Sequence, residues 1–206
     1  MNIFQIGVCQ SNDDVHAYIR DNKINPDLLV LVEPMSIHNE EIWEVYKTLD
    51  CIDLDNVKLE NLAITTQSTG DISFYYHPND SGNPSTPPSF EVSSVDPMHL
   101  VKHGYRHDEL IELKVPTLTM DKLFDKYNVT DIDLLAIDTE GLDDTILKSI
   151  DHSRFNIKKI IFENLHIKDQ NIYSFLESCG YTIVDKNYGS AHDVGFNVLV
   201  EKNDYR

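Results

Sequence analysis

Short apolar runs alternate with amphipathic segments along most of the chain. The runs Leu28–Val32, Ile132–Ile137 and Ile160–Phe162 contain almost no polar position, which is typical of parallel strands that are buried on both faces of a sheet. Between such runs, apolar residues recur every three or four positions, which indicates crossover helices. The pattern predicts strands at Ile3–Ile6, Leu28–Val32, Val57–Ile64, Ile72–Tyr76, Leu113–Leu118, Ile132–Asp138, Lys159–Glu163, Tyr181–Asp185 and Val194–Val200, and helices at Asp13–Asp21, Ile42–Leu49, Asp121–Tyr127, Leu142–Ile150 and Asn171–Cys179.

The last two apolar runs, Tyr181–Asp185 and Val194–Val200, are joined by a short connection, which favours an antiparallel hairpin. A doubly wound sheet that is mostly parallel and closes with such a hairpin is the arrangement of class I methyltransferases. Dinucleotide dehydrogenases usually continue in parallel. We therefore predict an α/β fold with a doubly wound, Rossmann-like class I methyltransferase sheet and a C-terminal antiparallel hairpin.

Residues 65–112 interrupt the alternation of predicted strands and helices. They hold one expected strand, Ile72–Tyr76, and then the stretch Asn79–Ser94, which is rich in proline and serine and poor in apolar residues. A long irregular stretch inside a domain is usually a functional loop or a lid. Because no internal repeat or linker divides the chain, we expect a single domain over residues 1–206 with an inserted loop or lid at residues 65–112.

The chain is strongly acidic. It has 17 Lys and Arg against 35 Asp and Glu, a formal charge of −18, so nucleic acids and anionic membrane faces would be repelled. We expect no membrane span, and the scattered Cys9, Cys51 and Cys179 favour a reducing compartment. The sequence thus predicts a cytoplasmic protein with a small neutral or cationic ligand, and it does not indicate the oligomeric state.

Three of the apolar runs end in a carboxylate: Glu33, Asp138 and Glu163. Ligands of doubly wound sheets bind beyond the carboxyl ends of the strands. Acids gathered at one edge also need a cation, hydroxyl groups or N–H groups as partners. These three residues therefore indicate a ligand site.

The start of the chain favours S-adenosylmethionine over a dinucleotide. Gly7 follows the first strand and Glu33 ends the second, a spacing at which the acid can accept hydrogen bonds from ribose hydroxyls. The turn after the first strand lacks the further glycines that a pyrophosphate needs, whereas a sulfonium cation suits an acidic surround. We expect Gly7, Glu33 and Asp138 to contact S-adenosylmethionine, with Asn61 and Ala63 at the adenine edge. The alternatives are a solvated acid at Glu33 and ordinary strand ends at Asn61 and Ala63.

The sequence Asp-Thr-Glu-Gly at residues 138–141 carries candidate chemistry. Side chains two apart in an extended segment share a face, so Asp138 and Glu140 can face one pocket before the glycine turns the chain. The alternative for Asp138 is a helix-capping role. Asp143 and Asp144 fall in the first turn of the next helix, where acids complement the helix end, and we interpret them as structural.

Several histidines accompany these acids. His166 follows Glu163 by three residues and is a candidate general base or orienting residue, with a hydrogen-bonded structural role as the alternative. His99, His103 and His107 recur every four residues, which is a metal-ligand spacing. A glycine interrupts this helical pattern, and we interpret the three as surface or lid histidines.

Several segments resemble those of the FkbM family of methyltransferases. That family has a proline-containing strand leading to a Leu-Asp helix start, then a Lys-Ile-Asp-x-Glu-Gly core, then an apolar strand that ends in Glu. The resemblance implies transfer of a methyl group from S-adenosylmethionine, commonly to a hydroxyl of a sugar or another small metabolite. The matching segments, in the order of the family, are Phe4–Gly7, Val32–Pro34, Val115–Leu123, Ile132–Gly141 and Ile160–Glu163.

Two departures from that family pattern matter. Residues 7–11 read Gly-Val-Cys-Gln-Ser where the family usually has Gly-Ala-Asn and a second glycine, and Ala136 stands where a lysine is frequent. The second departure removes a positive charge near the site. The first leaves open an alternative function, a non-catalytic small-molecule binding module on the same fold.

For the enzyme, we expect Asp138, Glu163 and His166 to be catalytic, because a hydroxyl acceptor must be aligned and must lose its proton. The alternative is a Mg²⁺ ion held by Asp138, Glu140 and Glu163. Oxygen ligands suit this hard cation, which would orient an acceptor diol.

Overall fold

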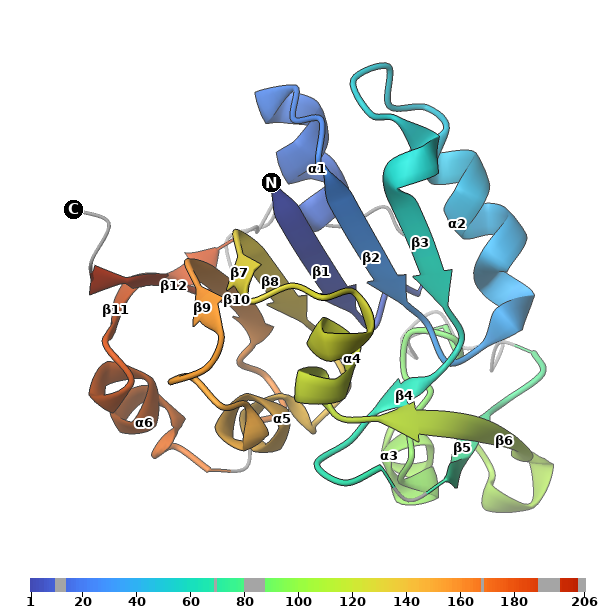
Figure 1. The fold of residues 1–206 in the computed structure, drawn as a ribbon. Helices are drawn as coiled ribbons and strands as arrows, with labels where there is room; N and C mark the ends of the chain where they lie inside the picture. The colour runs from blue at the N-terminus through green and yellow to red at the C-terminus, as the bar shows by residue number, and fades with distance from the viewer. Residues whose placement is uncertain (10–13, 69, 80–87, 168, 189–196, 204–206) are drawn as a thin grey trace.

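The expected doubly wound sheet is the centre of the fold (Figure 1). The computed structural model describes residues 1–9, 14–68, 70–79, 88–167, 169–188 and 197–203. Neighbouring strands from β10 to β3 are parallel, and β12 runs antiparallel to both of its neighbours. The sheet has seven strands in the order β11 (Tyr181–Tyr188), β12 (Asn197–Lys202), β10 (Lys159–Glu163), β8 (Leu134–Ile137), β1 (Asn2–Ile6), β2 (Leu28–Val32) and β3 (Val57–Glu60).

Helices cover both faces of this sheet, which explains why its strands do not alternate in polarity. On one face, Ile3 packs with residues of α1 (Asp14–Asn22) and α2 (Asn39–Tyr46). On the other face, Phe4 packs with α4 (Met120–Lys126), α5 (Asp143–Ser149) and α6 (Ile172–Ser178). The rings of Phe4 and Phe124 meet edge to face at 4.9 Å. Among the residues that the structure describes, no helix has the length and apolar composition needed to cross a membrane.

The inserted region forms a second, smaller unit beside the sheet. In Figure 1 it lies at the end of the sheet toward which the arrows of β1, β2 and β3 point. It contains the helix α3 (Pro97–Lys102) and a three-stranded sheet in the order β4 (Ala63–Ile64), β6 (Ile111–Leu118) and β5 (Asp71–Tyr76), so the unit extends slightly beyond the predicted bounds of 65–112 on both sides. The backbones of Tyr75 and Ser94 exchange two hydrogen bonds, of 2.8 and 3.1 Å, which tie the segment before α3 to β5.

The helix α3 is absent from the sequence prediction, although its start signal is present. Asp96 caps the helix by accepting a hydrogen bond of 2.9 Å from the Met98 N–H, and Pro97 occupies the first turn. Leu100 packs with Val92 and Tyr105 in a small core of its own. Part of the expected irregular stretch, residues 80–87, lies outside the described residues.

Two predicted strands are each divided in two. The predicted strand Val57–Ile64 leaves the large sheet after β3, and β4 pairs with β6 instead. The side-chain amide of Asn61 causes this exit by donating a hydrogen bond of 2.9 Å to the Glu33 carbonyl and by pairing with Asn39.

The predicted strand Ile132–Asp138 is interrupted at Asp133. The Asp133 carboxylate accepts a hydrogen bond of 2.7 Å from the Asn2 N–H and also binds Lys158. Residues before this break form β7 (Asp131–Ile132), which pairs with β9 (Asn156–Ile157), and residues after it form β8. Short 3₁₀ turns occupy Ser36–His38, Leu54–Asn56 and His107–Glu109.

Gly7 directly follows β1 and lies beside Asp138, which directly follows the neighbouring strand β8. Its N–H donates a hydrogen bond of 2.9 Å to the Val32 carbonyl, and its φ is +79°. A Cβ atom at this position would lie 1.7 Å from the carbonyl oxygen of Asp138. Both the left-handed backbone and the contact with Asp138 therefore require glycine.

We predict that Gly7→Ala destabilises the protein by at least about 3 kcal/mol, because overpacking adds to the cost of a left-handed backbone. Gly70→Ala is the matched control, since Gly70 also has a positive φ, +93°, but a Cβ there meets nothing within 4 Å. It should cost roughly 1–2 kcal/mol. Urea unfolding of both variants measures the difference, and equal losses would show that the approach to Asp138 is not a constraint.

Candidate functional site

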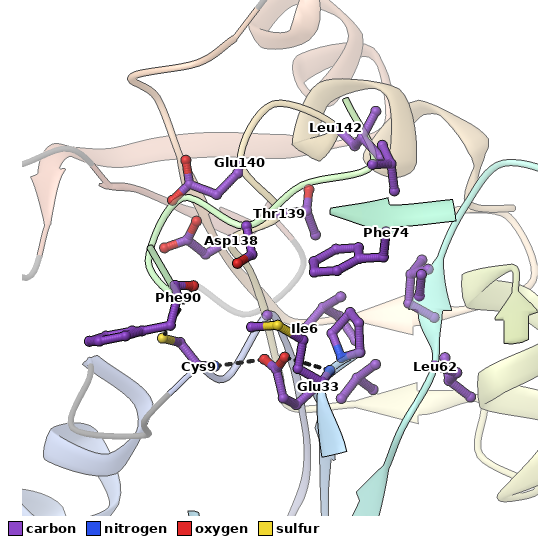
Figure 2. Close-up of a pocket in the computed structure, with 18 of the residues that line it drawn as sticks. Ile6, Cys9, Glu33, Leu62, Phe74, Phe90, Asp138, Thr139, Glu140 and Leu142 are labelled. Atoms are coloured by element: carbon purple, nitrogen blue, oxygen red, sulfur yellow. Dashed lines mark hydrogen bonds between the residues drawn. The ribbon is translucent and has the colours of Figure 1, made fainter. Parts of the chain in front are cut away.

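A cavity of about 290 Å³ opens beyond the carboxyl ends of β1, β2 and β8 (Figure 2). The loops after these strands form part of its wall, and the inserted region supplies the rest. The wall contains apolar and acidic side chains, and among the described residues none that lines the cavity is basic. The lining residues on which the argument depends are Gly7, Glu33, Ala63, Phe90, Asp138 and Glu140.

Glu33 is held rigidly at this cavity. One carboxylate oxygen accepts a hydrogen bond of 2.9 Å from the Cys9 N–H, and the other accepts one of 2.9 Å from the Met35 N–H, as the dashed lines of Figure 2 show. The residue is 4% exposed, and burial raises the pKa of its carboxyl to about 7 despite the two hydrogen bonds. Each oxygen keeps further acceptor capacity, so the carboxylate can still bind a hydroxyl group.

Asp138 and Glu140 line another side of the cavity. Asp138 is an exposed residue directly after β8, and its N–H donates a hydrogen bond of 2.9 Å to the Ile6 carbonyl. The extended geometry assumed for the sequence 138–141 is not present, because Glu140 has a φ of +55°. Both side chains line the cavity all the same.

Asp143 braces the loop that carries these two acids, and Asp144 binds the segment that follows β10. Asp143 accepts hydrogen bonds from the Thr139 hydroxyl at 2.8 Å and the Thr139 N–H at 3.3 Å. It is 2% exposed, and burial raises the pKa of its carboxyl to about 6. Asp144 accepts a hydrogen bond of 3.0 Å from the Asp169 N–H.

Glu163 and His166 form a pair next to the cavity. His166 Nδ1 lies 2.9 Å from a Glu163 carboxylate oxygen and 3.3 Å from Glu140 Oε2. Burial and the charges of Glu140 and Asp143 raise the pKa of Glu163 to about 8. Neither Glu163 nor His166 lines the cavity, whereas Glu140 belongs to both the cavity and the pair.

Of the five residues expected to contact a cofactor, four line the cavity and one does not. Gly7, Glu33, Ala63 and Asp138 all line the cavity. Asn61 does not line the cavity. Its side chain forms hydrogen bonds with the Glu33 carbonyl and with Asn39.

The side chains that lie close enough together to bind a metal ion are not the three that the sequence predicted. Within the described part of the chain, Glu140, Glu163 and His166 each offer a ligand atom within 4.8 Å of the others, and so do His99, His103 and His166. Asp138 belongs to neither group, so the expected oxygen set of Asp138, Glu140 and Glu163 is not assembled.

His99 and His103 lie on the inserted segment, at α3 and its C-cap, but they are not simple surface histidines. The side chain of His99 is only 12% exposed. Sequence spacing suggested His107 as their partner, yet His107 is exposed on the next turn. Their neighbour is His166, whose ring centroid lies 4.9 Å from that of His99, and no spacing in the sequence links these two positions.

Comparisons with known proteins show the family and support the fold. The sequence model of the Methyltransferase FkbM domain matches residues 6–183. No curated protein matches the chain significantly. Among solved structures, the chain is similar to the methyltransferase FkbM from Methylobacillus flagellatus KT, with 12% identity and a TM-score of 0.53 over 97% of this chain and 43% of that one. It is also similar to a chain of a fibrillarin/Nop5p complex, with 10% identity and a TM-score of 0.47 over 98% of this chain and 72% of that one.

At 12% identity, the similarity to the Methylobacillus protein supports the fold and nothing further. The chain spans less than half of the length of the Methylobacillus protein.

Because the Glu33 carboxyl is buried, we predict that the free energy of unfolding depends on pH. Its pKa is raised from 4.5 to about 7, so between these values the folded state binds more protons than the unfolded state. Its contribution to the free energy of unfolding is therefore present below about pH 4.5 and is lost as the pH rises to about 7, by up to about 3 kcal/mol.

Urea unfolding at pH 5 and pH 8 measures this contribution. Asp143 and Glu163 have raised pKa values of the same sign, so we expect the wild type to lose stability over this interval. Between pH 5 and pH 8, the free energy of unfolding of Glu33→Gln should fall by roughly 1–3 kcal/mol less than that of the wild type. An identical pH dependence in the two proteins would mean that Glu33 is already ionised at pH 5.

Proposed function

Because the chain belongs to the FkbM methyltransferase family, we propose that it transfers a methyl group from S-adenosylmethionine to a hydroxyl of a small acceptor, such as a sugar. The cavity beyond β1, β2 and β8 is the observation that carries the proposal. It is lined by acids and by no described basic residue, which suits a sulfonium cation and disfavours a phosphate ligand. The formal charge of −18 likewise favours a small acceptor over a nucleic acid.

The residues present fit S-adenosylmethionine. The Glu33 carboxylate, fixed by two N–H groups, retains acceptor capacity for ribose hydroxyls. Ala63 and its neighbours Leu62 and Ile64 give an apolar wall that suits a flat adenine ring. Gly7 has no side chain to obstruct the methionine part, and Asp138 adds negative charge on another side of the cavity.

When bound, this cofactor supplies an electrophilic methyl group. The task of the protein is then to align the acceptor oxygen about 3 Å from that group and to remove the hydroxyl proton. Asp138 is the proposed proton acceptor because, of the three expected catalytic residues, it is the one that lines the cavity.

Glu163 and His166 do not line the cavity, so we assign them a positioning role. They act on Glu140, whose Oε2 atom lies 3.3 Å from His166 Nδ1. Phe90, Ser93 and Val95 bring the inserted segment to the same cavity, which supports a role of that segment in acceptor recognition.

The assignment of Glu33 to the ribose predicts weaker cofactor binding in Glu33→Ala. Loss of the charge-assisted hydrogen bonds should cost about 1.5–3 kcal/mol in titration calorimetry with S-adenosylmethionine. Glu44→Gln, a change at an exposed ion pair with Lys47, is the control and should bind like the wild type. Unchanged affinity in a folded Glu33→Ala variant would refute the assignment.

Asp138→Asn should lower methyl transfer roughly 10²–10⁴-fold, since a positioned base contributes this much, and should change cofactor affinity far less. The assay incubates the chain with S-adenosylmethionine and a panel of sugars and other hydroxylated metabolites, and detects methylated product by mass spectrometry. Asp50→Asn alters an exposed acid and serves as the control. Full activity in Asp138→Asn would exclude it as the base. Tight cofactor binding without transfer to any acceptor would favour the binding-module alternative.

A further inference from the structure

Two groups of three metal-binding side chains, which share His166, lie beside the cavity, and their five residues come from three separate parts of the chain. His99 and His103 belong to α3 and its C-cap in the inserted region. Glu140 lies in the loop after β8, Glu163 ends β10, and His166 follows β10. One ligand atom from each of the three histidines lies within 4.8 Å of the other two, and the same holds for Glu140, Glu163 and His166.

Three of the contacts within this cluster have the spacing of ligand atoms in a metal coordination shell. Ligand atoms at 2.0–2.1 Å from a tetrahedral Zn²⁺ ion lie roughly 3.3 Å from one another. Glu140 Oε2 lies 3.1 Å from His99 Nε2 and 3.3 Å from His166 Nδ1. His166 Nδ1 lies 2.9 Å from a Glu163 carboxylate oxygen.

Two atoms of this cluster lack a partner with hydrogen-bond geometry. His99 Nε2 and Glu140 Oε2 are both shielded from solvent, and although they lie 3.1 Å from each other, neither has such a partner among the described residues. A buried polar atom without a hydrogen bond is costly. Glu163 is 7% exposed and stands beside the second carboxylate, Glu140, an arrangement that a cation stabilises.

The imidazole rings of the cluster lie close together. Burial and the neighbouring His99 lower the pKa of His103. The rings of His99 and His103 lie with centroids 4.7 Å apart, and those of His99 and His166 lie 4.9 Å apart.

We propose that His99, His103, Glu140, Glu163 and His166 form a binding site for a first-row transition-metal dication of the Zn²⁺ type. Three imidazoles exclude an assignment to Mg²⁺, which prefers an octahedral set of oxygen ligands. The bound ion would join α3 of the inserted region to the loops after β8 and β10. Because Glu140 also lines the cavity, the ion would fix one part of the cavity wall. The site goes beyond the proposed methyl transfer and does not depend on it.

The test measures metal binding in the absence of any cofactor or acceptor. The chain is freed of metal with a chelator and titrated with Zn²⁺ by calorimetry and with Co²⁺ by visible absorption. We expect one ion per chain, Co²⁺ absorption bands typical of nitrogen and oxygen ligands, and no comparable binding of Mg²⁺. His99→Asn and His103→Asn should each weaken Zn²⁺ binding at least 10-fold.

His107→Asn is the matched control, because His107 completes the four-residue spacing in the sequence but is exposed and belongs to neither group of gathered ligands. It should bind Zn²⁺ like the wild type. Thermal melting in chelator verifies that each variant folds, and Zn²⁺ should raise the Tm of the wild type but not that of His99→Asn. If a histidine variant fails to fold, Glu140→Gln, which keeps the size of the side chain, takes its place.

Absence of Zn²⁺ binding in the wild type overturns the proposal, as does an equal loss in His107→Asn. These outcomes are distinct from a failure of the proposed function. S-adenosylmethionine is titrated separately into the same proteins, and the Glu33 carboxylate that would bind it lies outside the cluster.

Discussion

The close approach of β1 and β8 at their carboxyl ends is the constraint on which the rest of the site depends. Gly7 lets the backbone of the first strand pass against the Asp138 carbonyl with no side chain between them. That contact sets the direction of two loops: the one whose Cys9 N–H orients Glu33, and the one that carries Asp138, Thr139 and Glu140. A small shift of either strand end would therefore move carboxylates on two sides of the cavity at once.

The sequence predicts the large sheet well because the signal is local. Strands packed on both faces by helices give apolar runs without alternation, and the boundaries of β2 and β10 agree with the predicted ones. The failures arise where one polar side chain overrides an apolar run. Asn61 lies where the chain leaves the sheet and binds the Glu33 carbonyl. Asp133 interrupts the predicted strand Ile132–Asp138 by binding Asn2 and Lys158.

The candidate site is only partly predictable, for a related reason. Strand topology alone brings Glu33 and Asp138 to one edge of the sheet, and both line the cavity. The meeting of His99 with His166 depends on how the inserted region docks, which no local pattern in the sequence reports. The spacing of the histidines suggested His107 as a partner, but the chain turns away after His103, and His166, which follows β10, lies beside His99 instead.

The inserted region begins and ends in adjacent strands. β4 and β6 pair in parallel, with Ala63 opposite Thr117 and Ile64 opposite Leu118, so the chain enters and leaves the insert at one place. The insert also has a small core of its own around Leu100. Closing a loop costs only slightly more entropy as the loop grows. The residues between β4 and β6 can therefore change in length or sequence while the seven-stranded sheet keeps its register, so that the part of the cavity wall which they supply can vary independently of the sheet.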